Sequence, residues 1–185
     1  MRKDAARNRE RLIAVAREYF RAGVADVSLE EIAVKAGVGR STLFRNFADR
    51  LDLIRAVQAA EQHVIAEECR RLGDRPDALF GLMRTVARLT FIYRAMDDSL
   101  LASPAGKAMM LQVSRETAAT FAEPIARARA AGLLRADVAL EDILIACTMI
   151  GAAQGGDFST SDAIFDRAFA LILRGIGAVD GGAAA

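Results

Sequence analysis

Two arginines, a serine and a threonine lie close together in the first third of the chain, a combination typical of nucleic-acid contacts. Arg40, Ser41, Thr42 and Arg45 fall within six residues. An arginine can donate two hydrogen bonds to a guanine, whereas serine and threonine hydroxyls can bind a phosphate or a base edge. The residue types and their spacing therefore indicate contact with DNA.

A short helix predicted over residues 40–47 would place these polar groups on one face. At about 100° per residue, Leu43 and Phe47 point together toward a core. The opposite face then carries the polar side chains of Ser41, Thr42 and Arg45. Arg40 begins the helix, where free backbone amides favour a phosphate.

A second helix is predicted just before this one, and its start is encoded in the sequence. Ser28 can cap a free amide while Glu31 reaches back to the Ser28 backbone. The apolar face consists of Leu29, Ile32, Ala33 and Ala36. Gly37-Val38-Gly39 then allows a tight turn with positive φ. Two helices joined by such a turn form the helix-turn-helix shape that fits the major groove.

A further helix is predicted ahead of this pair, and the arm that precedes the pair is basic. Its apolar stripe consists of Leu12, Val15, Ala16, Tyr19 and Phe20. Gly23 is placed to end it. The basic arm contains Arg2, Lys3, Arg7 and Arg9. Such an arm could reach a phosphate or a minor groove.

The stretch VSLEEIAVKAGVGRSTLFRNFADRLDLI resembles the DNA-binding signature of the tetracycline-repressor (TetR) family of bacterial regulators, over roughly residues 8–57. The resemblance implies three residues that face bases: Arg40, Ser41 and Arg45. It implies four that border phosphates: Thr42, Phe44, Asn46 and Arg50. As in that family, we expect a homodimer that represses from a palindromic operator and is released by a small effector.

Three positions depart from the family pattern. Gly39 stands where a Ser or Thr cap is common, Phe44 where a Tyr often meets phosphate, and Asn46 where His is frequent. Phe44 cannot make the hydrogen bond of a Tyr hydroxyl, whereas Asn46 can still bond a phosphate.

The composition predicts an all-α chain with a basic N-terminal part. Apolar residues make up 53% of the 185 residues, and helical spacing prevails along the chain with no alternation typical of strands. Residues 1–55 hold 12 Lys or Arg and 8 Asp or Glu, a net charge of +4, whereas residues 56–185 have a net charge of −3. This asymmetry indicates a basic module on an acidic body.

Long helices are predicted beyond Asp49, which looks like a helix cap with Asp52 three residues later. The predicted ranges are 50–71, 76–96, 104–131, 139–154 and 161–176. Pro124 should kink the third of these or split it into two. By resemblance, residues 5–56 form the three-helix DNA-binding domain and residues 57–178 a larger helical domain for effector binding and dimerisation. The tail at 179–185 has too little to bury and is expected to be flexible.

The helix predicted over 139–154 is apolar almost all round and must be covered on every side. With the helix that follows, it could form half of a four-helix dimer interface. The predicted interface residues are Ile143, Cys147, Ile150, Phe165, Phe169 and Ile172. A plain intrachain core explains the same residues.

A pocket for a mostly apolar effector is predicted in the same domain, because bulky adaptable side chains lie near polar groups that could orient a ligand. The predicted lining is Met83, Thr90, Phe91, Met109, Gln112 and Phe121. Heptad-like spacing in this region is also typical of plain core packing.

An enzyme is the main alternative class, yet the chain has a single His, no glycine-rich phosphate loop and no metal-ligand cluster. We therefore expect no catalytic residue, metal or cofactor. His63 and Glu67 could bind a metal weakly, but a solvated helix face explains them better. A helical module that binds protein and not DNA is a further alternative, and salt dependence distinguishes it because phosphate binding weakens steeply with salt.

Two features of the sequence bear on its compartment. Cys69 and Cys147 have no paired spacing, so a disulfide framework is not expected and a reducing cytoplasm is the default. No apolar run reaches the roughly 18 residues of a membrane span, so no membrane partner is expected.

Overall fold

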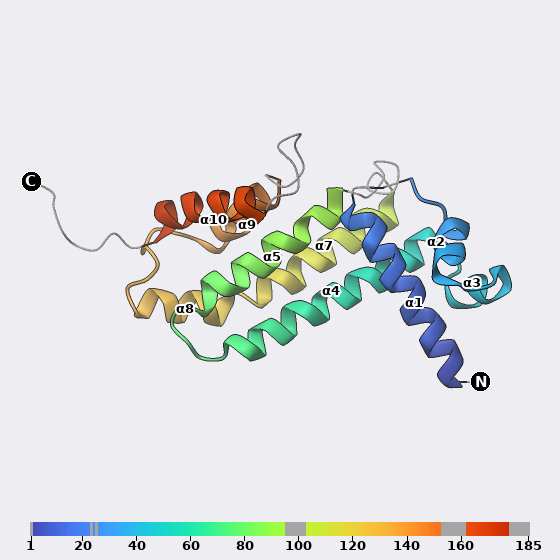
Figure 1. The fold of residues 1–185 in the computed structure, drawn as a ribbon. Coiled ribbons are helices and arrows are strands. Elements are labelled where there is room, and N and C mark those ends of the chain that lie inside the picture. The colour runs from blue at the N-terminus through green and yellow to red at the C-terminus, as the bar shows by residue number, and fades with distance from the viewer. Residues whose placement is uncertain (1, 23, 25, 95–102, 153–161, 178–185) are drawn as a thin grey trace, which may run out of the picture. The chain divides into compact units, whose positions relative to one another are not determined.

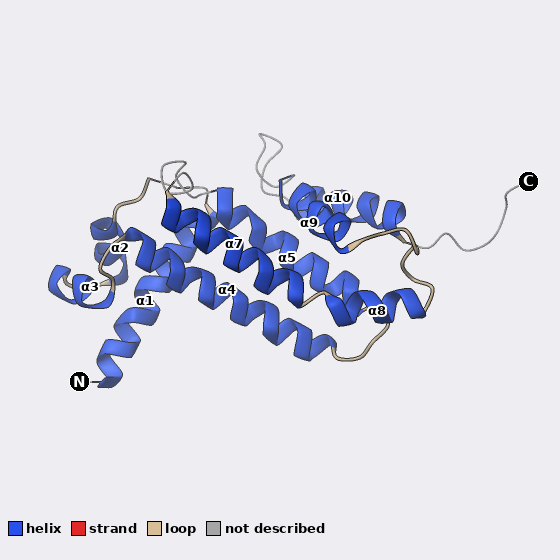
Figure 2. Cartoon of the chain, turned by 180° about the vertical axis from the view of Figure 1, so that it is seen from behind, coloured by secondary structure: helices blue, strands red, loops and turns tan. Residues whose placement is uncertain are grey.

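The computed structural model describes residues 2–22, 24, 26–94, 103–152 and 162–177, apart from the side chains of residues 2, 3 and 91–94. These residues form helices and connecting loops without a strand among them (Figure 2). The all-α prediction is therefore confirmed for this part of the chain.

The chain divides into two compact units, Met1–Gln62 with Ile92–Val113, and His63–Phe91 with Ser114–Ala185. The first contains α1 (Arg2–Arg21), α2 (Leu29–Ala36) and α3 (Arg40–Asn46). In this unit α1 packs on α2 and α3, and α2 packs on α3 (Figure 1). Their shared core is formed by Leu12, Ala16, Phe20, Ile32, Leu43 and Phe47.

The boundary between the units falls within three helices: α4 (Arg50–Leu72), α5 (Ala78–Arg94) and α7 (Pro104–Ala119). The second unit also contains α8 (Ala122–Ala130), α9 (Leu140–Ala152) and α10 (Asp162–Ile176). Within it α9 and α10 pack together. No described helix is long and apolar enough to cross a membrane.

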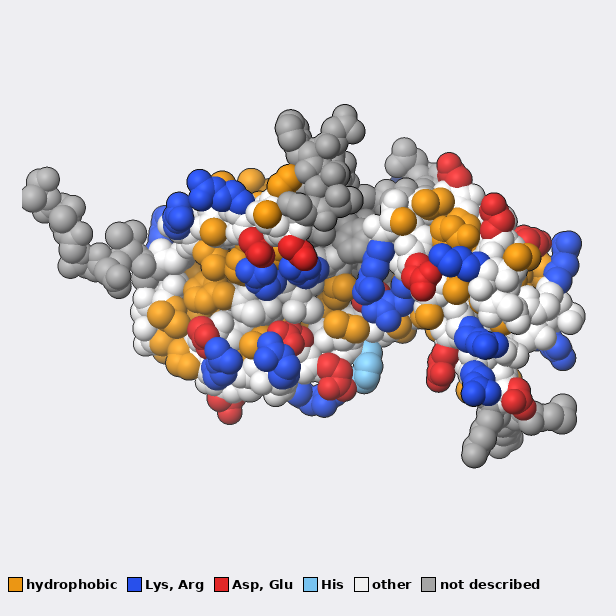
Figure 3. Space-filling view, in the orientation of Figure 1, with side chains coloured by type: hydrophobic (Ala, Val, Ile, Leu, Met, Phe, Trp, Pro, Cys, Tyr) orange, Lys and Arg blue, Asp and Glu red, His pale blue; other side chains and the backbone are white. Residues whose placement is uncertain are grey.

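Charged and aromatic side chains join α5 to α10 in the second unit. Arg84 and Arg88 lie 2.5 and 2.9 Å from carboxylate oxygens of α10. Both guanidiniums also lie over the ring of Phe165, at 5.6 and 4.4 Å from its centre. On the face of this unit drawn in Figure 3, basic and acidic side chains lie directly against one another. The arginines thus cover part of the aromatic surface of α10.

The predicted helix boundaries agree with the structure to within about two residues. Asp49 accepts a hydrogen bond from the Asp52 backbone at 2.8 Å, which confirms it as the cap of α4. The segment predicted at 104–131 is split into α7 and α8, as Pro124 suggested. Pro124 lies in the first turn of α8, where a backbone N–H would have no acceptor within the helix, so the absence of this N–H costs no helical hydrogen bond.

The basic arm that precedes the helix-turn-helix lies within α1, which begins at Arg2. The segment has no Gly or Pro to interrupt it, and Ala and Arg are good helix formers. Arg7 is exposed on this helix, whereas Arg9 lies over the ring of Phe47 at 4.6 Å. Gly23 and the predicted flexible tail lie outside the described residues.

Candidate nucleic-acid interface

The start of α2 is fixed by the capping box that the sequence predicts. The Ser28 hydroxyl accepts a hydrogen bond from the Glu31 backbone at 3.1 Å, and the Glu31 carboxylate accepts one from the Ser28 backbone at 2.8 Å. The hydrogen bond from the Ser28 backbone, and then that from its hydroxyl, lowers the pKa of Glu31. The helix is thereby held at its N-terminus with two backbone donors satisfied.

The turn between α2 and α3 uses its two glycines differently. Gly37 has a φ of 65°, a left-handed conformation that other residues rarely adopt, and its N–H donates to the Val34 carbonyl at 3.1 Å. Gly39 has an extended backbone and precedes α3 without a side-chain cap. The backbone amides at the start of α3 therefore have no capping side chain over them.

The short helix α3 separates a packed face from an exposed one. Leu43 and Phe47 are fully buried, whereas Ser41 and Arg45 are exposed. Phe44 leaves 42% of its surface exposed, a large fraction for an aromatic residue. The two faces predicted from helical periodicity are thus confirmed.

Arg45 lies along the exposed face of its own helix. Its Nε donates to the Ser41 carbonyl at 3.0 Å, and its Nη2 donates to the Thr42 hydroxyl at 2.9 Å. These bonds hold the guanidinium close to α3, and one terminal nitrogen, Nη1, is not used in either of them. The hydrogen bond to Thr42 can therefore orient the Arg45 guanidinium toward a partner on the exposed face of α3.

Arg40 is held by a neighbour that the sequence analysis missed. Its Nη2 lies 3.4 Å from the Glu30 carboxylate of α2, and its guanidinium lies 5.6 Å from the centre of the Phe44 ring. The side chain is still 76% exposed. Glu30 and Phe44 thus orient Arg40 while leaving it accessible.

Asn46 and Arg50, predicted to border phosphates, are both partly buried and make contacts inside the unit. The Asn46 amide donates to the Thr42 carbonyl at 2.8 Å. The Arg50 guanidinium donates to the Val27 carbonyl and lies 5.8 Å from the centre of the Phe20 ring. Arg50 therefore has a packing role that sequence reasoning did not find.

Ion pairs connect α1 to its neighbours in the same unit. Arg17 donates twice to Glu61 of α4, at 2.5 and 3.0 Å, and the Glu61 side chain is only 4% exposed. Lys35 of α2 lies 2.8 Å from Glu18, and this hydrogen bond is the main cause that raises the pKa of Lys35. Partners 44 residues apart, such as Arg17 and Glu61, have no signal in the spacing of the sequence.

The predicted effector residues differ in their burial. Met83, Met109 and Phe121 are buried, whereas Gln112 is exposed. Thr90 is half-buried and donates to the Ala87 carbonyl at 2.8 Å. The side chain of Phe91 lies outside the described residues. A pocket that the structure does describe is lined by other residues of the second unit.

Most of the predicted interface residues pack inside the chain itself. Five are buried: Ile143, Cys147, Ile150, Phe165 and Phe169. Ile172 is half-buried. Their exposed neighbours are Ile145 and Met149 on α9, and Leu171 on α10. An intrachain core, the alternative left open by the sequence, thus accounts for the five buried side chains.

Two family models match the chain. The model described as "Bacterial regulatory proteins, tetR family" matches residues 12–57. The model described as "Transcriptional regulator SbtR-like, C-terminal domain" matches residues 74–178, more than half of the chain. The chain belongs to the TetR family. The first match contains all of α2 and α3 with their turn, so the geometry above belongs to the family's N-terminal domain.

Solved structures of TetR-family proteins resemble this chain over nearly its whole length. A TetR transcription regulatory protein from Mycobacterium vanbaalenii has 29% identity and a TM-score of 0.69, over 95% of this chain and 98% of that one. The TetR regulator SCO0520 from Streptomyces coelicolor has 25% identity and the same TM-score, over 92% and 99%. These similarities agree with the predicted fold of a helix-turn-helix domain followed by a helical domain.

A curated relative matches a shorter part of the chain. The HTH-type transcriptional regulator SAUSA300_2515 of Staphylococcus aureus (strain USA300) is 35% identical over 102 residues, which is 55% of each chain. The chain thus spans about half the length of the curated relatives it matches.

Proposed function

We propose that this TetR-family chain is a DNA-binding transcriptional regulator that inserts α3 into the major groove. The observation that carries the proposal is the division of α3 into a fully buried face, Leu43 and Phe47, and an exposed polar face. A short helix anchored on one side and polar on the other has the shape and chemistry for reading base edges. The helical protein-interaction module, the alternative interpretation, gives no role to the oriented arginines.

Base contacts are assigned to Arg40, Ser41 and Arg45. Arg45 is aimed along the exposed face by Thr42, and Arg40 is oriented by Glu30 and Phe44. An oriented guanidinium loses less conformational entropy on binding and suits the two acceptors of guanine. These contacts would supply sequence specificity.

Backbone contacts are assigned to Thr42, Phe44, Asn46 and Arg50. Phe44 can offer only its ring to the sugar-phosphate backbone, whereas the Asn46 amide would have to share its bond to Thr42. Arg50 would add positive charge near the backbone while keeping its packing against Phe20. These contacts would set the register of α3 in the groove.

The partner in solution is proposed to be a second copy of the chain. Ile145 and Met149 lie one turn apart on α9 and are more than half exposed, and Leu171 of α10 is exposed to a similar extent. A two-fold axis would present two α3 helices to the two halves of a palindrome. By likeness to the family, the complex is proposed to repress and to be released by a small effector.

Selection of binding sites from random duplex DNA tests the proposal directly. A palindromic consensus with two half-sites about one helical turn apart is expected. Affinity for that site should fall steeply as salt rises. Arg115→Ala removes an exposed arginine of α7 and is the matched control for loss of an arginine from α3. This control should leave the affinity for DNA and its salt dependence unchanged. Failure to enrich any sequence, with salt-independent binding, would contradict the proposal.

A further inference from the structure

An acidic side chain lies beside Arg40 on the exposed side of the helix-turn-helix. The Glu30 carboxylate of α2 is 3.4 Å from Nη2 of Arg40, the first residue of α3. Both side chains are open to solvent, with 47% of Glu30 and 76% of Arg40 exposed. A negative charge therefore lies within the surface that is proposed to meet DNA, which is itself a polyanion.

Glu30 is the charged residue of α2 that pairs with α3. Glu31 caps its own helix, since its carboxylate accepts hydrogen bonds from the Ser28 backbone at 2.8 Å and from the Ser28 hydroxyl at 2.7 Å. Lys35 pairs with Glu18 of α1 at 2.8 Å. The hydrogen bonds that cap α2 therefore do not involve Glu30, whose charge acts on the neighbouring helix.

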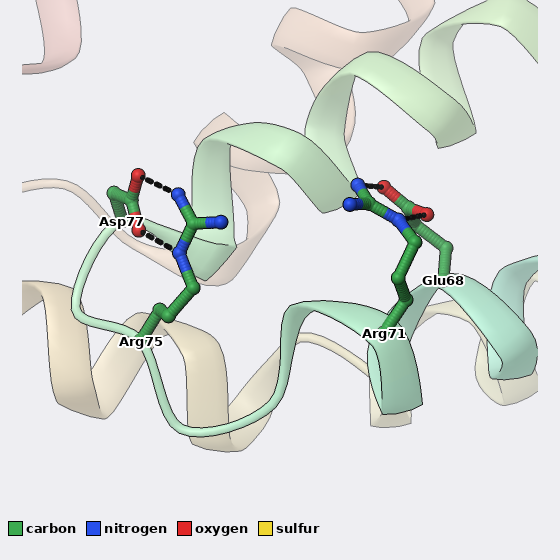
Figure 4. Close-up of polar contacts among 4 residues, drawn as sticks. All are labelled: Glu68, Arg71, Arg75 and Asp77. Atoms are coloured by element: carbon green, nitrogen blue, oxygen red, sulfur yellow. Dashed lines mark hydrogen bonds and ion pairs between the residues drawn. The ribbon is translucent and has the colours of Figure 1, made fainter.

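The contact between Glu30 and Arg40 is looser than the arginine–carboxylate pairs of the second unit. Each pair drawn in Figure 4 is joined by two hydrogen bonds of 2.6–2.9 Å: Arg71 with Glu68, and Arg75 with Asp77. Arg40 meets Glu30 through one nitrogen at a longer distance, and a guanidinium carries five N–H donors. A solvated pair of this kind is weak, so Arg40 can turn to an acceptor on DNA.

Phosphate and guanine compete for Arg40 once α3 is in the groove. The Arg40 guanidinium lies 5.6 Å from the centre of the Phe44 ring, and Phe44 is proposed to border the DNA backbone, so phosphates would lie within reach. A phosphate bound to Arg40 would be repelled by the Glu30 charge, because salt screens charges only beyond about 8 Å. Guanine is neutral and offers two acceptors, O6 and N7. Glu30 therefore weakens a phosphate contact of Arg40 more than a guanine contact.

We propose that Glu30 is a positioning residue that sets how well α3 distinguishes specific from non-specific DNA. It acts through Arg40, because it repels phosphates and so directs the guanidinium to a guanine. The inference rests on the proposed function, since it requires that α3 enters the major groove. It deepens that function by assigning part of the specificity to a residue of α2 that has the same sign of charge as DNA.

Glu30→Gln tests this role because it removes the charge and keeps the size of the side chain. The full-length protein would be titrated with two duplexes of equal length, the selected palindromic site and a scrambled sequence, over a range of salt concentrations. The variant should bind the scrambled duplex about threefold or more tightly than the parent, and the ratio of the two affinities should fall. Its salt dependence on the scrambled duplex should steepen by about 0.9 per subunit, the value for one added phosphate contact.

Three further variants separate this role from a general effect of charge. Glu18→Gln removes the same charge from another exposed pair between helices of the unit, and it should leave the ratio of affinities unchanged. Glu30→Asp keeps the charge and should retain most of the parental discrimination. In an Arg40→Ala background, Glu30→Gln should change neither the ratio nor the salt dependence, because Glu30 acts through Arg40. Circular dichroism checks that α2 remains folded.

Two results would overturn the role of Glu30 and leave the proposed function intact. One is a parent protein and a Glu30→Gln variant that distinguish the two duplexes equally well, with the same salt dependence. The other is an effect of Glu30→Gln that is as large in the Arg40→Ala background as in the parent. A parent protein that binds neither duplex would instead contradict the proposed function, and this inference with it.

Discussion

Arg45 shows how a single side chain on α3 is prepared for its proposed contact. Its bonds to Ser41 and Thr42 fix two of its nitrogens along the helix. Sequence periodicity places Arg45 on the outer face but gives no information on which way the guanidinium turns. The structure adds the role of Thr42 as a positioning residue, which implies that the two residues act together.

Replacing Arg45 with Ala should weaken binding to the selected DNA site by about 1–3 kcal/mol and relax discrimination at one base pair. The helix should remain folded, because its packing comes from Leu43 and Phe47. Competition binding against single-base variants of the site measures both effects, and circular dichroism checks the fold. If Arg45→Ala binds every variant of the DNA site with the affinity of the parent protein, Arg45 contacts no base.

The thiol of Cys147 should make stability depend on alkaline pH. Burial raises its pKa to about 12, compared with an ordinary value of 9.0. Between these values the unfolded chain loses the thiol proton while the folded chain keeps it. Stability should therefore fall as pH rises above 9, by up to about 1.4 kcal/mol per pH unit from this group.

Urea unfolding of the parent and of Cys147→Ala from pH 8 to 10.5 measures this dependence. The variant loses packing at every pH, but its free energy of unfolding should fall less steeply above pH 9 than that of the parent. Parallel curves for the two proteins would contradict the assignment to Cys147.

At the scale of helices, the local signals in the sequence were sufficient to find the ends of most elements. Ser28, Asp49 and Pro124 act on their own helix, so their effects can be predicted from neighbouring residues. Contacts between helices could not be predicted in this way. The Arg17–Glu61 and Arg40–Glu30 pairs depend on how separate helices pack, and the sequence around a helical Glu does not indicate which arginine it will contact.

Ser28→Ala tests the cap of α2. Loss of the hydroxyl acceptor should lower the free energy of unfolding by about 1 kcal/mol. The pKa of Glu31 should rise toward its ordinary value, because one of the two hydrogen bonds that lower it is gone. Because the pKa of Glu31 is lowered in the folded chain, the ionised carboxylate stabilises the fold above pH 4.5, and this stabilisation is lost in acid. The free energy of unfolding of Ser28→Ala should therefore fall less on acidification than that of the parent.

Thermal unfolding and an NMR titration of Glu31 measure these changes. Ser41→Ala is the matched control, since this exposed serine of α3 makes no cap and its loss should leave stability unchanged. A Glu31 pKa identical in parent and Ser28→Ala would show that the capping box does not govern this group.

Gly151 marks a close approach of α9 to α5. A Cβ at this position would lie 1.9 Å from the Thr90 hydroxyl and 2.8 Å from the Ala87 carbonyl. Thr90 could change rotamer, but a backbone carbonyl within a helix cannot yield as easily. Gly151→Ala should therefore destabilise the fold by about 1–3 kcal/mol.

Calorimetry should show this as a drop in Tm of several degrees. Gly175→Ala in α10 is the matched control, because a Cβ there meets nothing within 4 Å. Alanine is the better helix former, so that control should be neutral or slightly stabilising. Equal Tm values for the two variants would mean that α9 and α5 do not approach this closely.

At the scale of the whole molecule, burial separates the residues that stabilise one chain from those that could join two. The sequence identified an apolar helix at 139–154 but could not decide which side faces a partner, since both sides are apolar. The structure buries Ile150 in the chain's own core and leaves Ile145 and Met149 outside. A charge at Ile150 would therefore unfold the chain rather than separate two copies.

Ile145→Glu and Met149→Glu should convert a homodimer to monomers while each chain stays folded. Both side chains are more than half exposed, so the charge would be solvated in a monomer and buried without a partner only in the dimer. Sedimentation velocity at micromolar concentration measures the change, and affinity for a palindromic site should fall with it because two half-sites are no longer bound together. Leu111→Glu on α7, where the side chain is 53% exposed, is the matched control and should remain a dimer that binds DNA. A monomeric parent protein, or variants that sediment as the parent does, would remove α9 from the proposed interface.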